Sequence, residues 1–585
     1  MKKIILLLAN ILPICLFGQF HDNTTLLGYR GGQFSPPGDA FGISVLTFPD
    51  GKLLVQENLE LGMYFDGTNA ITSDSNGILQ MYTNGGDIGN VQWGNMENGE
   101  TLTNDGPGPN IWPQFALALP KPGPGNRIAL LYGDEELFSF TDPDTILWIV
   151  SLNLYAAEID MNLNNGLGKV ISRGEVVIGD TLGIGKFTAT KHANGRDWWI
   201  LAHEHDTDRF YRLLLDPEGI HNLGRQSVGV PFLDGFGQAC FSPNGEHYVR
   251  YEGIDYDTAG HGGFFHFYDF DRCTGLLSNH RQINVKPGAW GGCAISLDSR
   301  YVYFNQWILT YQYDLWAQDL AASQKVVAEY DGYLAPNPTR FMFLQLFPDG
   351  KIYSCTSTRS NVLHTIHYPD EPGMACQYEQ HAVHLPTRNA FSIPNFPYFR
   401  LGPLDGSPCD TLGLNNHPKA WYRYEQDTLN ALAVEFRDLS YYKPATWAWD
   451  FGDGSPASST RHPQHQYAQP GAYQACLTVS NQYGADTHCK TLYLGVTAQD
   501  NPVLQAQVRV WPNPFHDRFT VALSANLRNP ALRLHDAAGR LVLEQRLVLG
   551  VNEIETGTLP PGLYIWEVTA GGERVKAGKI AKHER

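Results

Sequence analysis

The sequence predicts an all-β protein made of several folded modules. Its 585 residues include 59 Gly, 36 Pro, 29 Tyr, 29 Phe and 13 Trp. Turn formers together with aromatic residues are typical of many short strands joined by tight turns. No sustained helical period interrupts residues 19–404, which disfavours an α/β fold. Several domains are expected at this length, because one domain usually has about 100–200 residues.

The first 18 residues predict a secretory signal peptide. Met1 to Lys3 form a short basic region, Ile4 to Phe17 are almost wholly apolar, and Gly18 is a small residue suited to cleavage before Gln19. The stretch is too short to span a membrane. A lipoprotein interpretation of Cys15 is disfavoured because Ile14 stands where a small residue is needed. No later stretch approaches 18 uninterrupted apolar residues, so an integral membrane protein is not expected.

Charge and cysteine content agree with export. The 42 Lys and Arg residues against 60 Asp and Glu residues give a net charge of −18, which argues against nucleic-acid binding and favours solubility. Signal removal leaves eight of the nine cysteines, and an even number in an exported protein permits disulfides.

A degenerate repeat runs through residues 19–404. Its unit is an apolar run, a turn that usually contains Asp-Gly or Asn-Gly, and a second strand that begins at once. Well-formed copies begin at Thr47, Phe241, Ile295 and Leu346, and looser copies begin at Ala118 and Thr190. The last three well-formed copies are 54 and 51 residues apart. A period near 50 predicts a β-propeller of about seven blades, with a pair of β-sandwiches as the alternative.

Three segments of this region resemble a propeller-like family found ahead of PKD domains in Bacteroidetes. They are residues 71–85, 96–99 and 267–278. The resemblance supports the propeller and implies no particular activity.

The second module, residues 405–496, is centred on Trp447-Ala-Trp-Asp-Phe-Gly-Asp-Gly454. Trp447, Trp449 and Phe451 alternate onto one face of a strand before the glycines turn the chain. With His465-Gln-Tyr467 and Gly471-Ala-Tyr473 downstream, the segment resembles a PKD domain, an immunoglobulin-like sandwich that acts as a spacer or binding module. We call it the PKD module. Its motif residues are Trp449, Asp450, Phe451, Gly452, Asp453 and Gly454.

Two details of the PKD module follow from local geometry. If Gln482 and Tyr483 form a hairpin loop, Cys476 lies opposite Cys489 at a separation that suits a disulfide; two free thiols are the alternative. Asp450 and Asp453 could contribute to a calcium site, but bonding to the backbone of the turn is favoured. Partners of the remaining six mature cysteines are not predicted.

After a linker at residues 497–507, the last module comprises residues 508–585. It contains Val-Arg-Val-Trp-Pro-Asn-Pro-Phe, a turn at Asp536–Arg540, and Pro-Gly-Leu-Tyr from Pro561. The module resembles the type A C-terminal sorting domain of the type IX secretion system, with Trp511 where that family often has Tyr. We call it the sorting module and expect a β-sandwich. The motif residues are Pro512, Asn513, Pro514, Gly539, Gly562, Tyr564 and Lys579. The resemblance implies recognition by the type IX machinery and export across both membranes.

No catalytic, cofactor or metal site is predicted. His203-Glu-His-Asp206 lacks the spacing that places two imidazoles on one helix face, and on a strand His203 and His205 share a face while Glu204 points away. His261 and His266 flank a Gly-rich turn, and a zinc site there is disfavoured. Ser73–Gly77 is interpreted as a plain hairpin. Nucleophile-elbow, phosphate-loop and dinucleotide motifs are absent from the sequence.

The favoured function is binding or adhesion at the surface, with a glycan or protein held by loops at one end of the propeller. Four tryptophans could form a glycan platform, although packing between blades is favoured for them: Trp93, Trp112, Trp290 and Trp307. One alternative is a secreted hydrolase of polysaccharide or peptide with its site on propeller loops. Another is a purely structural surface protein. The sequence favours a binding protein over an enzyme.

Overall fold

A computed structural model describes most of the chain. The described residues are 19–29, 42–58, 61–102, 112–134, 136–139, 147–232, 234–253, 263–285, 290–389, 391–427, 429–495, 508–511, 514–523, 530–536, 540–548, 550–557, 559–570 and 573–583. The predicted signal peptide, the linker, His261, Pro512, Asn513 and Gly539 fall outside these ranges.

Seven antiparallel sheets, which we number as blades 1–7, follow one another in the described part of residues 19–404. Blade 1 is β1 (Thr24–Tyr29), β2 (Gly42–Thr47) and β3 (Leu54–Asn58), with η1 (Pro49–Gly51) in its second turn. Blade 2 is β4 (Ala70–Ser73), β5 (Leu79–Thr83) and β6 (Ile88–Asn90). Blade 3 is β7 (Ala116–Pro120), β8 (Arg127–Gly133), β9 (Glu136–Ser139), β10 (Leu147–Asp160) and β11 (Lys169–Leu182), with η2 (Asn164–Gly166) between the last two.

The remaining four blades have four strands each, in sequence order. Blade 4 is β12 (Thr188–Lys191), β13 (Trp198–His203), β14 (Arg209–Leu215) and β15 (Ile220–Ser227). Blade 5 is β16 (Ala239–Phe241), β17 (His247–Glu252), β18 (Gly263–Asp271) and β19 (Leu276–Val285). Blade 6 is β20 (Cys293–Ile295), β21 (Tyr301–Gln306), β22 (Leu309–Asp314), η3 (Ala321–Ser323) and β23 (Lys325–Glu329). Blade 7 is β24 (Phe341–Leu346), β25 (Ile352–Thr356), β26 (Ser360–Ile366), η4 (Gly373–Cys376) and β27 (Tyr378–Asn389).

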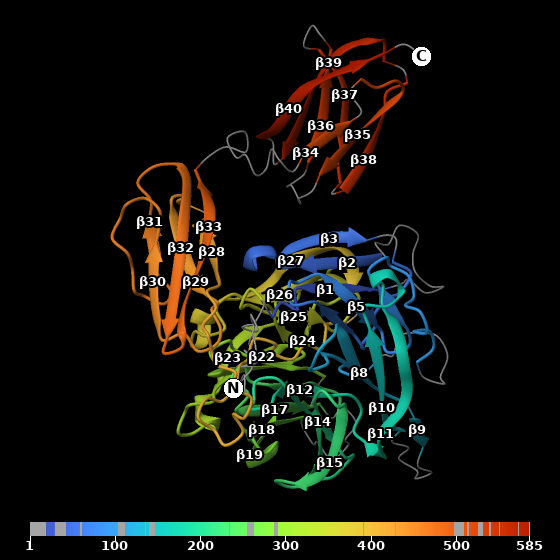
Figure 1. Cartoon of the computed structure of the whole chain (residues 1–585), viewed down its shortest axis with the longest axis vertical. Coiled ribbons are helices and arrows are strands. Elements are labelled where there is room, and N and C mark those ends of the chain that lie inside the picture. The colour runs from blue at the N-terminus through green and yellow to red at the C-terminus, as the bar shows by residue number, and fades with distance from the viewer. Residues whose placement is uncertain are drawn as a thin grey trace, which may run out of the picture.

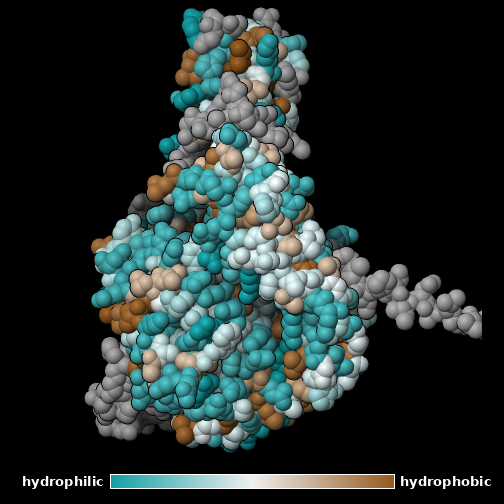
Figure 2. Space-filling view, turned by 90° about the vertical axis from the view of Figure 1, so that its left-hand side faces the viewer, coloured by the Kyte–Doolittle hydropathy of each residue, from teal (hydrophilic) through white to brown (hydrophobic). Residues whose placement is uncertain are grey.

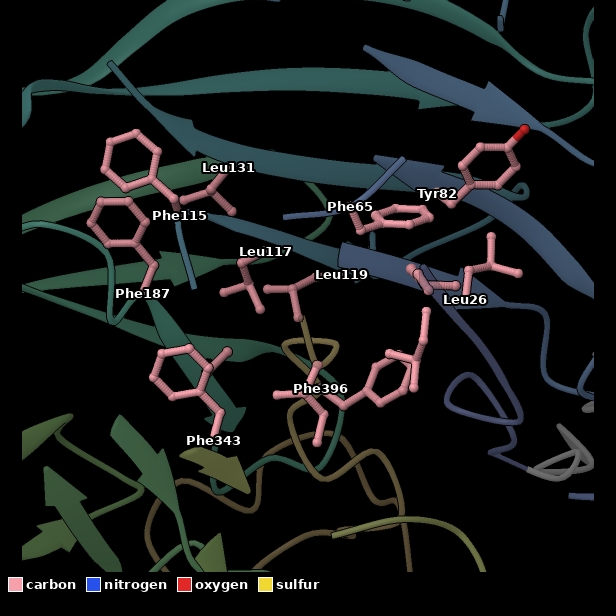
Figure 3. Packing of buried hydrophobic residues seen from close by; sticks show 14 of the residues in the cluster. Leu26, Phe65, Tyr82, Phe115, Leu117, Leu119, Leu131, Phe187, Phe343 and Phe396 are labelled. Carbon is pink, nitrogen blue, oxygen red and sulfur yellow. The ribbon is translucent and has the colours of Figure 1, made fainter. Parts of the chain in front are cut away.

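The first strands of the blades surround a common axis. Strand β1 contacts β4, β4 contacts β7, and β12, β16, β20 and β24 contact one another in that order (Figure 1). This arrangement confirms the predicted propeller, and the alternative of paired sandwiches is wrong. The large core cluster joins blades 1–4 and 7: Leu26, Leu117 and Phe343 come from β1, β7 and β24, and Phe396 joins them from beyond blade 7 (Figure 3).

The ring is closed by the segment that follows blade 7. Asn395 N donates to Asn69 O at 2.9 Å, and the Asn395 side chain donates to Ala116 O and Phe187 O at 3.0 and 2.8 Å. The segment therefore bonds to the inner ends of three blades. Farther along, Arg400 forms a buried ion pair with Asp22, which stands before β1.

The turns of the sequence repeat gather at one end of the propeller, which we call the turn end. In each well-formed copy the apolar run is one strand and the Pro-Asp-Gly type of turn leads directly into the next. Gly51 and Gly350, at φ +70° and +76°, adopt the left-handed conformation that such turns require. Both glycines approach Leu439 of the PKD module. The PKD module therefore covers part of the turn end.

The PKD module is a sandwich of two three-stranded sheets. One sheet comprises β28 (Tyr422–Gln426), β29 (Ala433–Asp438) and β31 (Gln464–Gln466), and the other β30 (Thr446–Asp450), β32 (Gly471–Asn481) and β33 (Gly484–Leu494). Trp449 and Phe451 are buried between them and Trp447 is half-buried, as their alternation predicts. Cys476 lies opposite Cys489 in the β32–β33 hairpin, and a disulfide joins the two.

Several contacts hold the PKD module against the propeller. Lys490 donates to Asp50 O of the turn after β2, and the Trp421 ring lies 5.0 Å from that of Phe20, between centroids. Lys351 Nζ lies 2.7 Å from Glu425 Oε1. A second disulfide joins Cys273, in the turn between β18 and β19, to Cys409. The predicted boundary between residues 404 and 405 stays a prediction.

The sorting module is also a two-sheet sandwich, as predicted. Its sheets are β34 (Val508–Trp511), β35 (Arg518–Leu523) and β38 (Gly550–Glu555), and β37 (Leu541–Arg546), β36 (Ala531–His535), β39 (Gly562–Ala570) and β40 (Glu573–Lys582). Asp536 and Arg540 exchange backbone and side-chain hydrogen bonds across the predicted turn.

Within the described ranges no helix has the length and apolarity that a membrane crossing requires.

Candidate functional site

A network of buried charges lies between blades 4 and 5, at the end of the propeller opposite the turn end. We call this the loop end. Lys186 precedes β12, His203 ends β13, Asp234 precedes β16, and Arg250 and Glu252 stand near the end of β17. All five side chains are at most 3% exposed. Charges this deep in a protein are stable only when they are paired and hydrogen-bonded.

The members of this ion network satisfy one another. Lys186 Nζ lies 2.9 Å from Glu252 Oε2 and donates to Gly235 O at 2.7 Å. Arg250 donates to both Asp234 and Glu252. Burial alone would raise the pKa of Asp234, but the adjacent histidines and Arg250 hold that pKa well below its ordinary value. Burial lowers the pKa of Lys186.

The edge of the network reaches solvent at His205 and Asp206, whose side chains are 13% and 29% exposed. His205 Nδ1 lies 3.2 Å from Asp234 Oδ2, and Asp206 N donates to the same oxygen at 3.0 Å. The ligand atoms of His205, Asp206 and Asp234 are within 4.8 Å of one another, as a metal site would need. Because Arg250, His203 and the Asp206 N–H already occupy the Asp234 carboxylate, we assign these residues to the ion network.

Three half-buried aromatic rings stand at the loop end beside this network. Ring centroids are 5.8 Å apart for Trp112 and Phe236 and 4.6 Å apart for Phe236 and Trp290. We call these three residues the aromatic row. The fully buried Phe343 backs the row at 5.5 Å from Phe236.

The ion network fixes the backbone that carries Phe236. Gly235 O accepts from Lys186, and Gly235 N donates to Glu252 Oε2 at 2.7 Å. Phe236 itself exchanges two backbone hydrogen bonds with Gly253. Buried charge therefore holds an aromatic ring in place on a loop, where a side chain would otherwise be free to move.

Amide side chains fill the propeller axis. Gln114 Nε2 donates to Ala239 O at 2.8 Å and to Asn395 Oδ1 at 3.1 Å. Gln238 Oε1 accepts from Leu344 N at 2.9 Å and from Cys293 N at 3.3 Å. A cavity of about 40 Å³ remains, lined in part by Cys240 and Cys293. It has room for little more than a water molecule.

The four candidate tryptophans do not form one platform. Trp112 and Trp290 meet through Phe236, whereas Trp93 lies against Tyr82 with centroids 6.2 Å apart. Trp307 donates to Ser357 Oγ at 3.1 Å and lies under Arg340. Phe236, which completes the aromatic row, carries no sequence signal beyond being aromatic.

The histidines of both motifs make contacts within the propeller. His203 and His205 both face Asp234, while Glu204 turns away to Arg209 and Arg225, as alternation along a strand predicts. His266 is fully buried, and its Nδ1 lies 3.0 Å from His280 Nε2.

The two carboxylate turns bind backbone. Asp74 Oδ1 accepts from Asn76 N and Ile78 N at 2.8 and 2.9 Å, which makes residues 73–77 a hairpin turn. Asp450 Oδ1 accepts from Gly452 N at 2.9 Å, and Asp453 Oδ1 accepts from Ser455 N at 3.0 Å. Asp453 Oδ2 also lies 2.8 Å from His465 Nε2. The backbone interpretation of these aspartates accounts for the contacts seen.

Four sorting-motif residues are described. Gly562 begins β39, and Tyr564 is buried and donates to Pro560 O at 2.5 Å. Lys579 lies opposite Ile565 on β40, and Pro514 is exposed beside the buried Phe515. The role of these residues in export stays a prediction.

Family models match the last two modules. Residues 422–496 match the model of the PKD domain, and residues 509–582 match the model of the secretion system C-terminal sorting domain. A search among curated proteins found no match.

Several solved structures are similar to parts of the chain. The PKD1 domain of Epp from Vibrio anguillarum is 30% identical, covering 14% of this chain and 99% of its own, with a TM-score of 0.13. A putative 6-phosphogluconolactonase from Bacteroides uniformis is 12% identical over 62% of this chain and 97% of its own, with a TM-score of 0.35. The Dos1 propeller is 9% identical over 64% and 87%, with a TM-score of 0.33.

The two family matches coincide with the two C-terminal sandwiches and with the motifs found there. The chain carries a PKD domain and a type IX sorting domain, and the sorting domain indicates export to the cell surface or beyond it.

Proposed function

We propose that this exported protein is a binding or adhesion protein, and that its propeller holds a glycan or a protein ligand at the loop end. The observation that carries the proposal is the aromatic row, Trp112, Phe236 and Trp290. These rings are half-buried and stand at the end of the propeller that the PKD module leaves uncovered.

The geometry of the propeller favours a surface ligand. The turn end is partly covered by the PKD module through Lys490 and Lys351, and the axis is filled by Gln114, Gln238 and Asn395. A ligand is therefore best placed across the loop end, over the rings.

Aromatic rings suit both proposed classes of ligand. They provide a large contact area with few rotatable bonds, so little conformational entropy is lost when a partner binds. The ion network adds rigidity beneath Phe236, and a pre-organised surface binds more tightly than a mobile one. The carboxylates Asp234 and Glu252 are already paired with Arg250 and Lys186, which favours a positioning role over acid–base catalysis.

The test uses the exported chain from Gln19 onward, applied to a glycan array and to cell-surface preparations, with product formation followed by mass spectrometry. We expect retention without turnover, and we expect Trp290→Ala to weaken it about tenfold, as truncation of a central aromatic contact does. Trp511→Ala is the matched control, because Trp511 is 43% exposed in the sorting module. Unaltered binding by a folded Trp290→Ala protein would reject the loop end, and turnover would favour the hydrolase.

A further inference from the structure

One strand of the sorting module is apolar on both of its faces. In β39, Tyr564 and Trp566 belong to the core of the module and are 4% and 7% exposed. Leu563 and Ile565 alternate with them and are 49% and 40% exposed. Because successive side chains of a strand point to opposite faces, Leu563 and Ile565 share the outer face of the sheet. Strands of a sandwich ordinarily carry polar side chains on that face.

Strand β35 of the same module shows the ordinary pattern. Phe519, Val521 and Leu523 are buried in the core, whereas Arg518 and Thr520 stand on the other face. The module therefore fills its core without needing apolar residues on the outer side of a strand. Apolar residues that are exposed next to one another are a fault of patterning unless they serve a function.

The exposed apolar residues of β39 continue across the sheet. His535 of β36 lies opposite Ile565, and Leu541 of β37 lies opposite His535. Leu541 is 51% exposed. Ala581 of β40 lies opposite Leu563. Residues directly opposite each other in antiparallel strands share a face, so these side chains stand together on the outer side of the sheet. We call Leu541, Leu563 and Ile565 the apolar patch.

Residues of the sorting motif surround the apolar patch. Gly562 begins β39 directly before Leu563, and Tyr564 stands between the two patch residues of this strand. Lys579 lies opposite Ile565 on β40 and is exposed. The motif therefore sets the position of the apolar patch and places one cation at its border.

The sorting module also differs from the rest of the chain in charge. Residues 508–585 contain 11 Lys and Arg residues against 8 Asp and Glu residues, whereas residues 19–507 contain 29 against 52. Such an asymmetry within one chain indicates that its parts meet different partners. A module with a surplus of positive charge associates faster with an acidic surface, because the two fields attract.

The sorting module stands apart from the propeller and the PKD module, at one end of the molecule (Figure 1). Hydrophobic residues lie among hydrophilic ones on the part of its surface that Figure 2 shows at the top. Apolar patches on a protein surface mark places where a partner binds. The match to the sorting-domain model names the kind of partner, since this module addresses the chain to the type IX machinery.

We propose that the apolar patch is the surface by which the export machinery holds the sorting module. Leu541, Leu563 and Ile565 contact an apolar area of an acidic receptor, and Lys579 pairs with a carboxylate at the border of that area. This contact concerns export alone, so it does not depend on what the propeller binds.

The experiment follows export of the full chain in a bacterium that has a type IX secretion system. Immunoblots of the medium and of protease-treated intact cells give the exported fraction. We expect Leu563→Ser combined with Ile565→Ser to lower this fraction at least about tenfold, because two apolar contacts with the receptor are lost. Both side chains are exposed, so the melting temperature of the purified variant should stay within about 2 °C of the parent.

Val548→Ser is the matched control, because Val548 is 67% exposed in the same module but lies outside the apolar patch. Its export should equal that of the parent. Lys579→Glu should lower export, and Lys579→Arg should restore it. The proposal is overturned if the folded double variant is exported like the parent, if Val548→Ser lowers export equally, or if Lys579→Glu and Lys579→Arg are exported alike.

Discussion

Arg400 and Asp22 form a buried ion pair across 378 residues of sequence, with Nη1–Oδ1 and Nη2–Oδ2 distances of 2.7 Å each. Their side chains are 7% and 3% exposed. Arg400 also donates to Gln19 O at 3.1 Å. The pair joins the segment after blade 7 to the segment before blade 1, so it closes the propeller ring at the turn end.

Breaking this pair should destabilise the propeller. Asp22→Ala leaves the Arg400 guanidinium buried without its carboxylate, and loss of one partner of a buried pair costs about 3–5 kcal/mol. The check is urea denaturation followed by tryptophan fluorescence. Glu553→Gln is the control, because its pair with Arg518 is over 60% exposed at both side chains and should contribute little. Equal stability of both variants would refute a closing role for Arg400.

The cysteines should be found in two disulfides and four free thiols. Peptide mapping of the exported chain without reduction is expected to recover Cys273–Cys409 and Cys476–Cys489. Alkylation under denaturing conditions should label Cys240, Cys293, Cys355 and Cys376. A Cys240–Cys293 linkage would contradict this assignment, although their sulfur atoms lie only 3.8 Å apart.

Asp370 should make stability depend on pH. Burial together with Asp298 raises the pKa of Asp370 to about 7 in the folded protein, and in the unfolded chain it returns to an ordinary carboxyl value near 4. At pH values between these two pKa values, the folded state binds more protons than the unfolded state. The contribution of Asp370 to folding stability is therefore fully present below about pH 4 and is lost as pH rises through 7.

Asp370→Asn should remove that dependence. The amide can donate to Asp298 as the protonated carboxyl does, and it does not ionise. We expect the melting temperature to exceed that of the parent by about 2 °C at pH 8 and to match it near pH 5. Differential scanning calorimetry at the two pH values is the measurement, and a parallel shift at both would show that ionisation is not the cause.

Asp234 should be essential to the stability of the ion network that joins blades 4 and 5 at the loop end. Asp234→Ala leaves Glu252 as the remaining carboxylate for Arg250 and Lys186 in the ion network. We expect this change to lower the free energy of unfolding by about 3–5 kcal/mol. The exposed Lys169–Glu97 pair supplies the control, Glu97→Gln, for which little loss is expected. Denaturant unfolding of the two variants gives the comparison. Stability like that of the parent in Asp234→Ala would mean that the network does not hold blades 4 and 5 together.

Local patterns in the sequence predicted the elements of this protein well. The alternation of Trp447, Trp449 and Phe451 gave a strand with one buried face, because successive side chains point to opposite sides. The two-residue loop at Gln482 and Tyr483 set the register that places Cys476 opposite Cys489. Both inferences need only neighbouring residues, whose geometry is limited by backbone sterics.

The candidate sites were much less predictable. His203 and His205 were visible as a motif, but Lys186, Asp234 and Glu252 look like ordinary surface residues in the sequence. Their meeting depends on how blades 4 and 5 pack.

The sequence by itself determined the all-β class, the order of the three modules, the C-terminal sorting signal and the two-residue hairpin with its disulfide. These follow from repeat period, turn chemistry and short family motifs, all of which act over a few residues or a regular interval. The tertiary structure alone decided the Arg400–Asp22 closure, the Cys273–Cys409 bridge and the ion network beneath Phe236. Each of these joins residues far apart in the chain, and such contacts form only when packing of whole blades and modules brings them together.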